Sequence, residues 1–270
     1  MTVTEPKKKI APQTCPLCNS QQDVIINGWG KSENGVVYMK DILEDKGYSF
    51  CNCRNVFFTD WSNINQGTYD PEYYKKYDKP FIDAAYRRTF NYKYQAIKDS
   101  LYFNAPFAPK VLDVGSINKT ILDCFKEKGF NTYGMDICDH PLGIHDLIVG
   151  DFENFVSRET YDVIWASHVF EHFKEPIEAV KKCNQLLNDG GILYVAMPDP
   201  YFIDFDDPYK WAHWHLREHF CLFDMDSFAD ILRENGFEII SKERNTHTDT
   251  ICSLDYGIIA KKRIDVKHYN

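Results

Sequence analysis

The chain has 270 residues, 44% of them hydrophobic, which is enough for one sizeable core with a small appended module. Its 31 basic and 40 acidic residues give a net charge of −9, which argues against a nucleic-acid partner because phosphate binding needs a positive field. No segment approaches the roughly 18 apolar residues of a membrane span, and the first residues lack the apolar region of a signal peptide. Five of the nine cysteines are scattered singly, which suits a reducing compartment. We therefore expect a cytoplasmic protein without a membrane span.

Four cysteines near the start of the chain form two close pairs. Cys15 and Cys18 make a CxxC knuckle and Cys51 and Cys53 a CxC pair, so four thiolates can enclose one structural zinc ion. A zinc ribbon usually closes with a second CxxC, and the alternative is therefore a ribbon without metal or four unrelated thiols. Because four protein ligands leave no open position on zinc, we expect no catalysis in this module.

Aromatic and apolar residues recur at helical spacing over residues 81–101, which predicts a long amphipathic helix beginning near Pro80. Such a stripe usually packs in a core. The functional alternative is a helical cap over an active site, with Tyr73, Tyr74 and Arg87 binding a substrate.

From Pro109 the chain alternates strands and helices, which predicts an α/β fold with a parallel, doubly wound sheet. Ligands of such sheets bind at the carboxyl ends of the central strands. We expect strands at 110–114, 131–136, 146–149, 161–166 and 191–196, helices at about 120–128, 176–187 and 226–235, then a strand after Gly236 and a last strand in "YGIIAKK".

The first of these strands runs into Gly115 in "KVLDVGSINKT", as a strand enters a nucleotide-binding turn. Further glycines would be expected at positions 117 and 119, where the chain has Ile117 and Lys119. Their absence weighs against a dinucleotide, whose pyrophosphate needs a glycine-rich turn.

Two later strands end in residues suited to a nucleoside. Asp136 follows Gly115 by 21 positions and can accept both hydroxyls of a ribose. Asp151 can accept an exocyclic amine, and Phe152 can stack on a purine. The alternatives are an ordinary surface aspartate and ordinary turn chemistry.

Histidines gather at two places. The segment "WASHVFEHF" sets His168, Glu171 and His172 at the end of the fourth strand, a cluster that is costly as pure structure. The segment "WAHWHLREHFCLF" then contributes Glu218 and His219, and also His213 and His215. A histidine is neutral near pH 7 and can act as a base there. The alternative is a mobile loop whose histidines only pack on its tryptophans.

The stretch "YDVIWASHVFEHFKEPIEAVKKCNQLLNDGGILYVAMPDP" resembles the class I S-adenosylmethionine-dependent methyltransferases. The resemblance covers roughly residues 109–262 and implies a Rossmann-like, seven-stranded sheet with a last antiparallel strand. The cofactor it implies, S-adenosyl-L-methionine, needs only one tight turn for its methionine tail. The resemblance places that cofactor on Asp113, Gly115, Asp136, Ile137, Asp151, Phe152, Ser167 and His168.

The cysteine-containing front end is similar to that of bacterial methyltransferases that act on sugars and polysaccharides. This resemblance implies a small-molecule, nucleotide-sugar or glycan acceptor, methylated on oxygen or carbon. It implies His219 as the general base, oriented by Glu218, with His172 and His168 as further catalytic candidates. Tyr209 and His215 join Tyr73 and Arg87 as candidate substrate contacts.

Two alternatives stay open. His168, Glu171 and His172 with His215 or His219 can form a metal site, an arrangement similar to that of small-RNA 2′-O-methyltransferases. The chain can also be a non-catalytic binding subunit with a degenerate cofactor loop. Homodimer formation is left open. The expected organisation is a tail (1–13), a zinc-ribbon-like module (14–60), a helical linker or cap (61–105), the methyltransferase domain (106–263) and a second tail (264–270).

Overall fold

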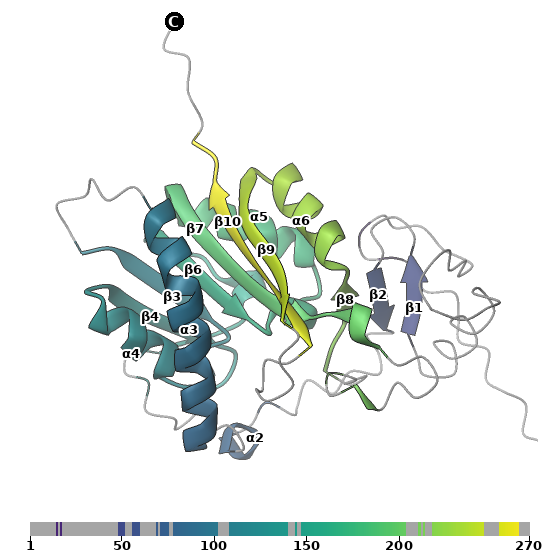
Figure 1. Ribbon diagram of the computed structural model, residues 1–270, viewed down its shortest axis with the longest axis horizontal. Helices are drawn as coiled ribbons and strands as arrows, with labels where there is room; N and C mark the ends of the chain where they lie inside the picture. Colours follow the sequence, from purple (N-terminus) through teal and green to yellow (C-terminus); the bar gives the residue numbers. More distant parts are fainter. Residues whose placement is uncertain are drawn as a thin grey trace, which may run out of the picture.

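The computed structural model in Figure 1 describes the chain in segments separated by gaps. For 48–51, 56–59 and residue 71 it describes only the course of the main chain. The described residues are 15, 17, 48–51, 56–59, 69, 71–75, 78–101, 108–139, 144, 147–203, 210–211, 213, 218–245 and 254–264.

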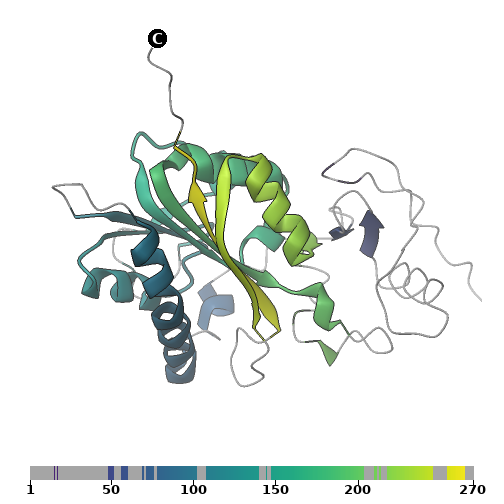
Figure 2. The ribbon, with the colours of Figure 1, turned by 45° about the horizontal axis from the view of Figure 1, so that its top comes forward.

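A seven-stranded sheet forms the centre of the described structure (Figures 1 and 2). Its order is β5-β4-β3-β6-β7-β10-β9, in which the first five strands are parallel and β10 runs antiparallel to both β7 and β9. This confirms the α/β class and the seven-stranded sheet. The strands are β3 (Lys110–Val114), β4 (Asn131–Asp136), β5 (Ile148–Val149), β6 (Tyr161–Ser167), β7 (Leu187–Pro198), β9 (Phe237–Asn245) and β10 (Asp255–Lys262).

Helices cover both faces of this sheet because the strands are apolar on both sides. In β3, Val111 packs in one hydrophobic cluster and Leu112 in the other. The helices α3 (Pro80–Ser100) and α4 (Thr120–Glu127) supply the first cluster, and α5 (Pro176–Leu186) and α6 (Met225–Glu234) the second. The long amphipathic helix predicted from residue 81 is confirmed as α3, whose buried stripe, including Phe90 and Ile97, packs in the core. None of the described helices is long and apolar enough to cross a membrane.

A second, three-stranded sheet joins the start of the chain to a late segment. Its order is β1 (Tyr48–Cys51), β2 (Val56–Thr59) and β8 (Cys221–Phe223), all antiparallel (Figure 1). β8 is fully buried and adds an edge to the N-terminal hairpin. The N-terminal segment is thus hydrogen-bonded to the chain just after His219.

Of the four cysteines predicted to bind zinc, Cys18 and Cys53 lie outside the described residues. Cys15 is completely buried, and its Sγ accepts a hydrogen bond from the main-chain N–H of Leu17 at 3.4 Å. Cys51 ends β1, where only the main chain is described. The zinc site therefore stays a prediction.

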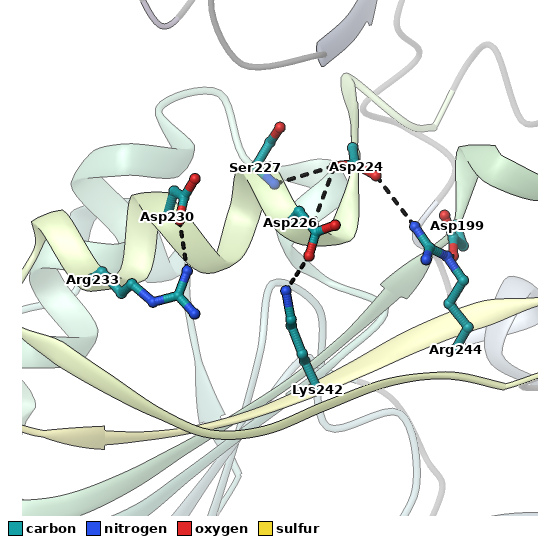
Figure 3. Close-up of polar contacts among 8 residues, drawn as sticks. All are labelled: Asp199, Asp224, Asp226, Ser227, Asp230, Arg233, Lys242 and Arg244. Atoms are coloured by element: carbon teal, nitrogen blue, oxygen red, sulfur yellow. Dashed lines mark hydrogen bonds and ion pairs between the residues drawn. The ribbon is translucent and has the colours of Figure 1, made fainter. Parts of the chain in front are cut away.

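Polar contacts fix α6 against β9 and the end of β7, as Figure 3 shows. Asp224 caps the helix by accepting hydrogen bonds from the main-chain N–H groups of Asp226 and Ser227. Arg244 of β9 bridges Asp224 and Asp199, with its Nε 2.6 Å from Asp199 Oδ2. Asp199 is completely buried, so this guanidinium compensates a carboxylate that would otherwise be costly to bury.

We predict that Phe170→Ala destabilises the fold by about 3–5 kcal/mol, because its ring is fully buried against Phe173 and Phe228 and truncation leaves a cavity. Phe81→Ala on the exposed side of α3 should change the free energy of unfolding by less than about 0.5 kcal/mol. Urea unfolding of both variants measures the difference. Equal effects would show that the Phe170 ring is not a core anchor.

Candidate active site

The turn after β3 is tight and depends on glycine. Gly115 has φ +71, and the N–H groups of Gly115 and Ser116 both donate to the carbonyl of Met135 at 2.9 Å. A Cβ at position 115 would lie 3.1 Å from Cγ2 of Val169. A single glycine therefore permits both the left-handed conformation and the close approach of the segment after β6.

Three buried polar side chains line this turn: Asp113, Ser116 and Asn118. Asp113 accepts a hydrogen bond from Ser116 Oγ at 2.8 Å. Burial raises the pKa of Asp113 to about 7; the Ser116 hydrogen bond opposes this shift and the nearby Asp136 adds to it. Asn118 is also buried, and its Nδ2 finds no hydrogen-bond acceptor among the described residues. Lys119, the other unusual residue of the loop, is exposed.

Asp136 lies at the end of β4, where the sequence predicts a ribose ligand. It is buried, and its Oδ1 accepts hydrogen bonds from Tyr74 Oη at 2.6 Å and from the main-chain N–H of Cys138 at 3.1 Å. Tyr74 comes from the short helix α2 (Pro71–Lys75). A segment far ahead of the sheet in sequence therefore contacts the expected cofactor edge.

The other predicted cofactor residues lie close by in sequence but differ in exposure. Ile137 is exposed. Asp151 caps a short 3-10 helix, η3 (Phe152–Asn154), by accepting from Glu153 N at 2.9 Å and Asn154 Nδ2 at 2.7 Å. Phe152 is buried and stacks on Phe173 with a centroid distance of 5.5 Å. Ser167 ends β6 and is half-buried.

His168 has an unusual main-chain conformation. Its φ of 54 is left-handed, which is strained for a residue with a side chain and is typical of functional sites. Its Nε2 lies 3.1 Å from Oδ2 of the buried Asp255, and its Nδ1 lies 3.5 Å from Oε1 of Glu171. The ring also stacks on His213 at 5.3 Å. A ring with a carboxylate beside each nitrogen is held in one orientation.

Glu171 lies at the centre of the cluster, in the 3-10 helix η4 (Phe170–His172). Only 1% of it is exposed, and neither carboxylate oxygen accepts a hydrogen bond within the described part of the chain. Burial raises the pKa of Glu171, but the imidazoles of His168 and His172 outweigh that effect, so the pKa is below its ordinary value. The site therefore holds a buried negative charge.

His172 presents one ring nitrogen as a proton acceptor. Its Nδ1 lies 2.7 Å from the main-chain carbonyl oxygen of Glu218, which can only accept, so Nδ1 carries the hydrogen. Nε2 of the neutral ring then has a lone pair, and it lies 3.9 Å from Glu171 Oε1. Tyr69 Oη is 2.9 Å from the same Nδ1. His219 is 5% exposed and packs edge-on against His172 at 4.9 Å.

The remaining predicted residues have three different outcomes. Tyr73 Oη donates to Oε2 of Glu218 at 3.2 Å and so lies beside the cluster. Arg87 instead faces α4, where Nη1 contacts Glu127 at 3.1 Å and Cys124 at 3.5 Å. Tyr209 and His215 lie outside the described residues.

Sequence reasoning missed several residues of this site. Tyr69 and Ser116 carried no motif, although both stand beside predicted residues. Asp255 is 87 positions from His168 and reaches it only because β10 pairs with β7 next to β6. A cue for Asp255 was its place at the start of a strand beside the predicted active-site edge.

Asp113→Asn tests the buried carboxyl of the turn. Because the folded-state pKa is raised to about 7, the wild-type free energy of unfolding should fall as pH rises from about 4 to about 7 and then level off. The variant has no carboxyl to titrate, so its free energy of unfolding does not fall over this range. Relative to the wild type it should rise by up to about 4 kcal/mol at alkaline pH and by little near pH 4. Urea unfolding across this pH range measures it, with the exposed Asp139→Asn as control. A pH-independent difference would contradict the assignment.

Comparisons with known proteins show which family the chain resembles. A family model described as "Methyltransferase domain" matches residues 79–242, more than half of the chain. The ubiquinone biosynthesis O-methyltransferase of Aliivibrio fischeri is 27% identical over 106 residues, covering 34% of this chain and 45% of that protein. The protein of the same name from Cronobacter sakazakii is 30% identical over 103 residues, covering 33% and 42%. The match thus spans less than half the length of these relatives.

Solved structures share the fold. An S-adenosylmethionine-dependent methyltransferase from Archaeoglobus fulgidus superposes with a TM-score of 0.51 at 18% identity, over 70% of this chain and all of that one. The plantazolicin methyltransferase BpumL, solved with S-adenosylhomocysteine, gives 0.50 at 15% identity, over 73% and 92%. The strand order and the extent of the family match lead to one conclusion: the chain belongs to the methyltransferase domain family, with the class I S-adenosylmethionine-dependent fold.

Proposed function

We propose that the protein transfers a methyl group from S-adenosyl-L-methionine to a hydroxyl or an acidic carbon of a small-molecule, nucleotide-sugar or glycan acceptor. The histidine pair His172 and His219 removes the acceptor's proton. The observation that carries the proposal is the hydrogen bond from His172 Nδ1 to the Glu218 carbonyl, which leaves Nε2 able to accept a proton at the carboxyl edge of the sheet.

The turn after β3 and the end of β4 fit the cofactor. Gly115 keeps side-chain atoms out of the turn, and the unsatisfied Nδ2 of Asn118 points to a missing polar partner. Asp136 can accept ribose hydroxyls, and Ser167 and His168 lie at the end of the central strand. When bound, S-adenosylmethionine supplies an electrophilic methyl group: its carbon–sulfur bond breaks with the electron pair staying on sulfur, while the acceptor's bond to that carbon forms.

The histidine cluster fits the removal of the acceptor's proton. Glu171 places a buried negative charge beside His172 Nε2, the atom that would take up the proton. His168 has a carboxylate beside each ring nitrogen, Glu171 and Asp255, and so fits an orienting role. Glu218 acts through its carbonyl on His172, and its carboxylate accepts from Tyr73. His219 packs edge-on against His172 and is the second candidate base of the pair.

The acceptor class rests on composition and resemblance. The net charge of −9 disfavours a polyanionic acceptor such as nucleic acid. The front end with its paired cysteines is similar to that of sugar methyltransferases, and relatives matched over part of the chain are named as O-methyltransferases. Both support a hydroxyl-bearing small molecule, nucleotide-sugar or glycan over a nucleic acid.

We also propose that the N-terminal cysteines bind structural zinc. A main-chain N–H directed at a cysteine sulfur two residues earlier, as between Leu17 and Cys15, supports a thiolate at that position. Cys15 is also buried in the same hydrophobic cluster as Phe220 and Phe223. Such a metal would stabilise the segment that pairs with β8.

Two variants separate cofactor binding from proton removal. We expect Asp136→Asn to weaken S-adenosylhomocysteine binding by roughly 10- to 100-fold, because it removes a charged acceptor of ribose hydroxyls. His172→Gln should still bind S-adenosylhomocysteine within about fivefold of the wild-type affinity but lose about 10²- to 10⁴-fold in turnover, because it removes a base. Calorimetry measures binding, and mass spectrometry of a nucleotide-sugar panel measures methyl gain.

The control for binding is Asp139→Asn, an exposed carboxylate three residues after Asp136. If the wild type bound no S-adenosylhomocysteine, the chain would be a non-catalytic subunit and the proposed activity would be wrong. If His172→Gln kept full turnover while His219→Gln lost it, the base would be His219 alone.

A second candidate is metal-assisted O-methylation at the same edge. Glu171, His172 and His219 each offer a ligand atom within 4.8 Å of the others. His172 donates its other nitrogen to a main-chain carbonyl, as metal-bound histidines usually do. Glu171 is buried and accepts no hydrogen bond from the described residues, which suits a carboxylate awaiting a cation. When bound, a divalent metal there would polarise an acceptor oxygen.

The metal candidate predicts that protein with Cys15, Cys18, Cys51 and Cys53 replaced by serine still binds one equivalent of added Mn²⁺ or Zn²⁺. Glu171→Gln in that background should abolish the binding, because it removes the central ligand, whereas Glu178→Gln on the exposed side of α5 should not. Elemental analysis after dialysis measures the metal. Absence of metal from the cysteine-free protein would leave the histidine base as the mechanism.

A further inference from the structure

Three tyrosines ahead of α3 lie between the expected cofactor edge and the histidine cluster. They are Tyr69, Tyr73 and Tyr74, here called the tyrosine strap. Tyr69 packs edge-on against Tyr73 at 5.2 Å, and Tyr73 against Tyr74 at 5.3 Å. In a close-packed site, a shift of one ring requires the ring that it contacts to adjust. The three rings of the strap therefore form one connected chain of contacts.

At its cofactor end the strap holds Asp136. The Tyr74 ring is 3% exposed, and its hydroxyl donates a 2.6 Å hydrogen bond to Oδ1. Burial and the neighbouring carboxylate raise the pKa of Tyr74 above its ordinary value, so the hydroxyl stays a donor. The main-chain N–H of Cys138 donates to the same oxygen, so two donors orient the carboxylate through Oδ1.

At its other end the strap holds the segment that orients His172. Tyr69 Oη lies 2.9 Å from His172 Nδ1, and the two rings are perpendicular. Tyr73 Oη donates to the Glu218 carboxylate, and the Glu218 carbonyl accepts from His172. A shift of the strap would therefore change the hydrogen bonding that fixes the His172 tautomer.

We propose that the tyrosine strap is a set of positioning residues that couples cofactor binding at Asp136 to the orientation of His172. The inference rests on the proposed function. A ribose bound to Asp136 restricts the Asp136 carboxylate, to which Tyr74 donates. That restriction passes through the ring contacts of the strap to Tyr69, whose hydroxyl lies beside Nδ1 of His172. Because coupling between two sites is reciprocal, a change at Tyr69 must also alter cofactor affinity.

The test measures S-adenosylhomocysteine affinity in Tyr69→Phe, Tyr74→Phe and the double variant. Tyr74→Phe should weaken binding about 3- to 30-fold through the lost hydrogen bond to a carboxylate. Tyr69→Phe, which does not remove that bond, should still weaken binding about 2- to 5-fold, and the double variant should lose less than the product of the two. The matched control is Tyr92→Phe, which removes an exposed tyrosine's hydrogen bond to Glu243.

A second readout separates coupling from simple packing. NMR of the His172 ring nitrogens should show a shift when the wild type binds S-adenosylhomocysteine, and Tyr74→Phe should reduce that shift by at least half even at saturating ligand. A purely structural role would lower stability but leave the ligand-induced shift intact. Phenylalanine keeps each ring in place, and the two single variants are read independently.

The outcomes are distinguishable. A wild type that binds no S-adenosylhomocysteine would overturn the proposed function and this inference together. A wild type that binds normally, with unchanged affinity in Tyr69→Phe or an undiminished His172 shift in Tyr74→Phe, would overturn the coupling alone.

Discussion

Glu171 carries a negative charge where almost no water reaches it, so neighbouring groups have to compensate that charge. His168 Nδ1 lies 3.5 Å from Oε1 of this carboxylate and can compensate the charge by carrying a hydrogen. The main-chain carbonyl of Glu171 also accepts from Phe220 N at 2.7 Å, which fixes the segment carrying His219. His168, in its left-handed conformation, and the buried His219 both lie beside this residue. One buried charge thus lies at the centre of the histidine cluster.

The fold could be predicted because its signals are local. Strand and helix periodicity, Gly115 in the first turn and the strand-end position of Asp136 each follow from a few adjacent residues. The strand-end cluster of His168, Glu171 and His172 was visible for the same reason. Of the predicted strand at 146–149, residue 146 lies outside the described residues, and Ile148–Val149 form β5 at the edge of the sheet beside β4.

The rest of the site depends on contacts between distant segments, which one sequence does not reveal. Asp255 meets His168 through strand order, and Tyr74 meets Asp136 across 62 positions. The aromatic stripe of α3 was correctly expected to pack in a core, whereas the residues just before it contact the site. Arg87 looked equivalent to Tyr74 in the sequence, yet helix geometry turns it towards α4. Local patterns specify elements, and the sheet order decides which side chains meet.

The pairing of β8 with β2 has a consequence for how the molecule assembles. The segment that carries His219 is followed by β8, whose hydrogen-bonding partner β2 lies much earlier in the chain. The strands β3, β4 and β5 instead pair with one another within residues 110–149, although Tyr74 also contacts Asp136 from 62 positions away. Long-range pairing forms late because its loop-closure entropy must be overcome first. During synthesis, the pairing of β2 with β8 must therefore wait until residues 221–223 have been made, whereas β3, β4 and β5 can pair before then.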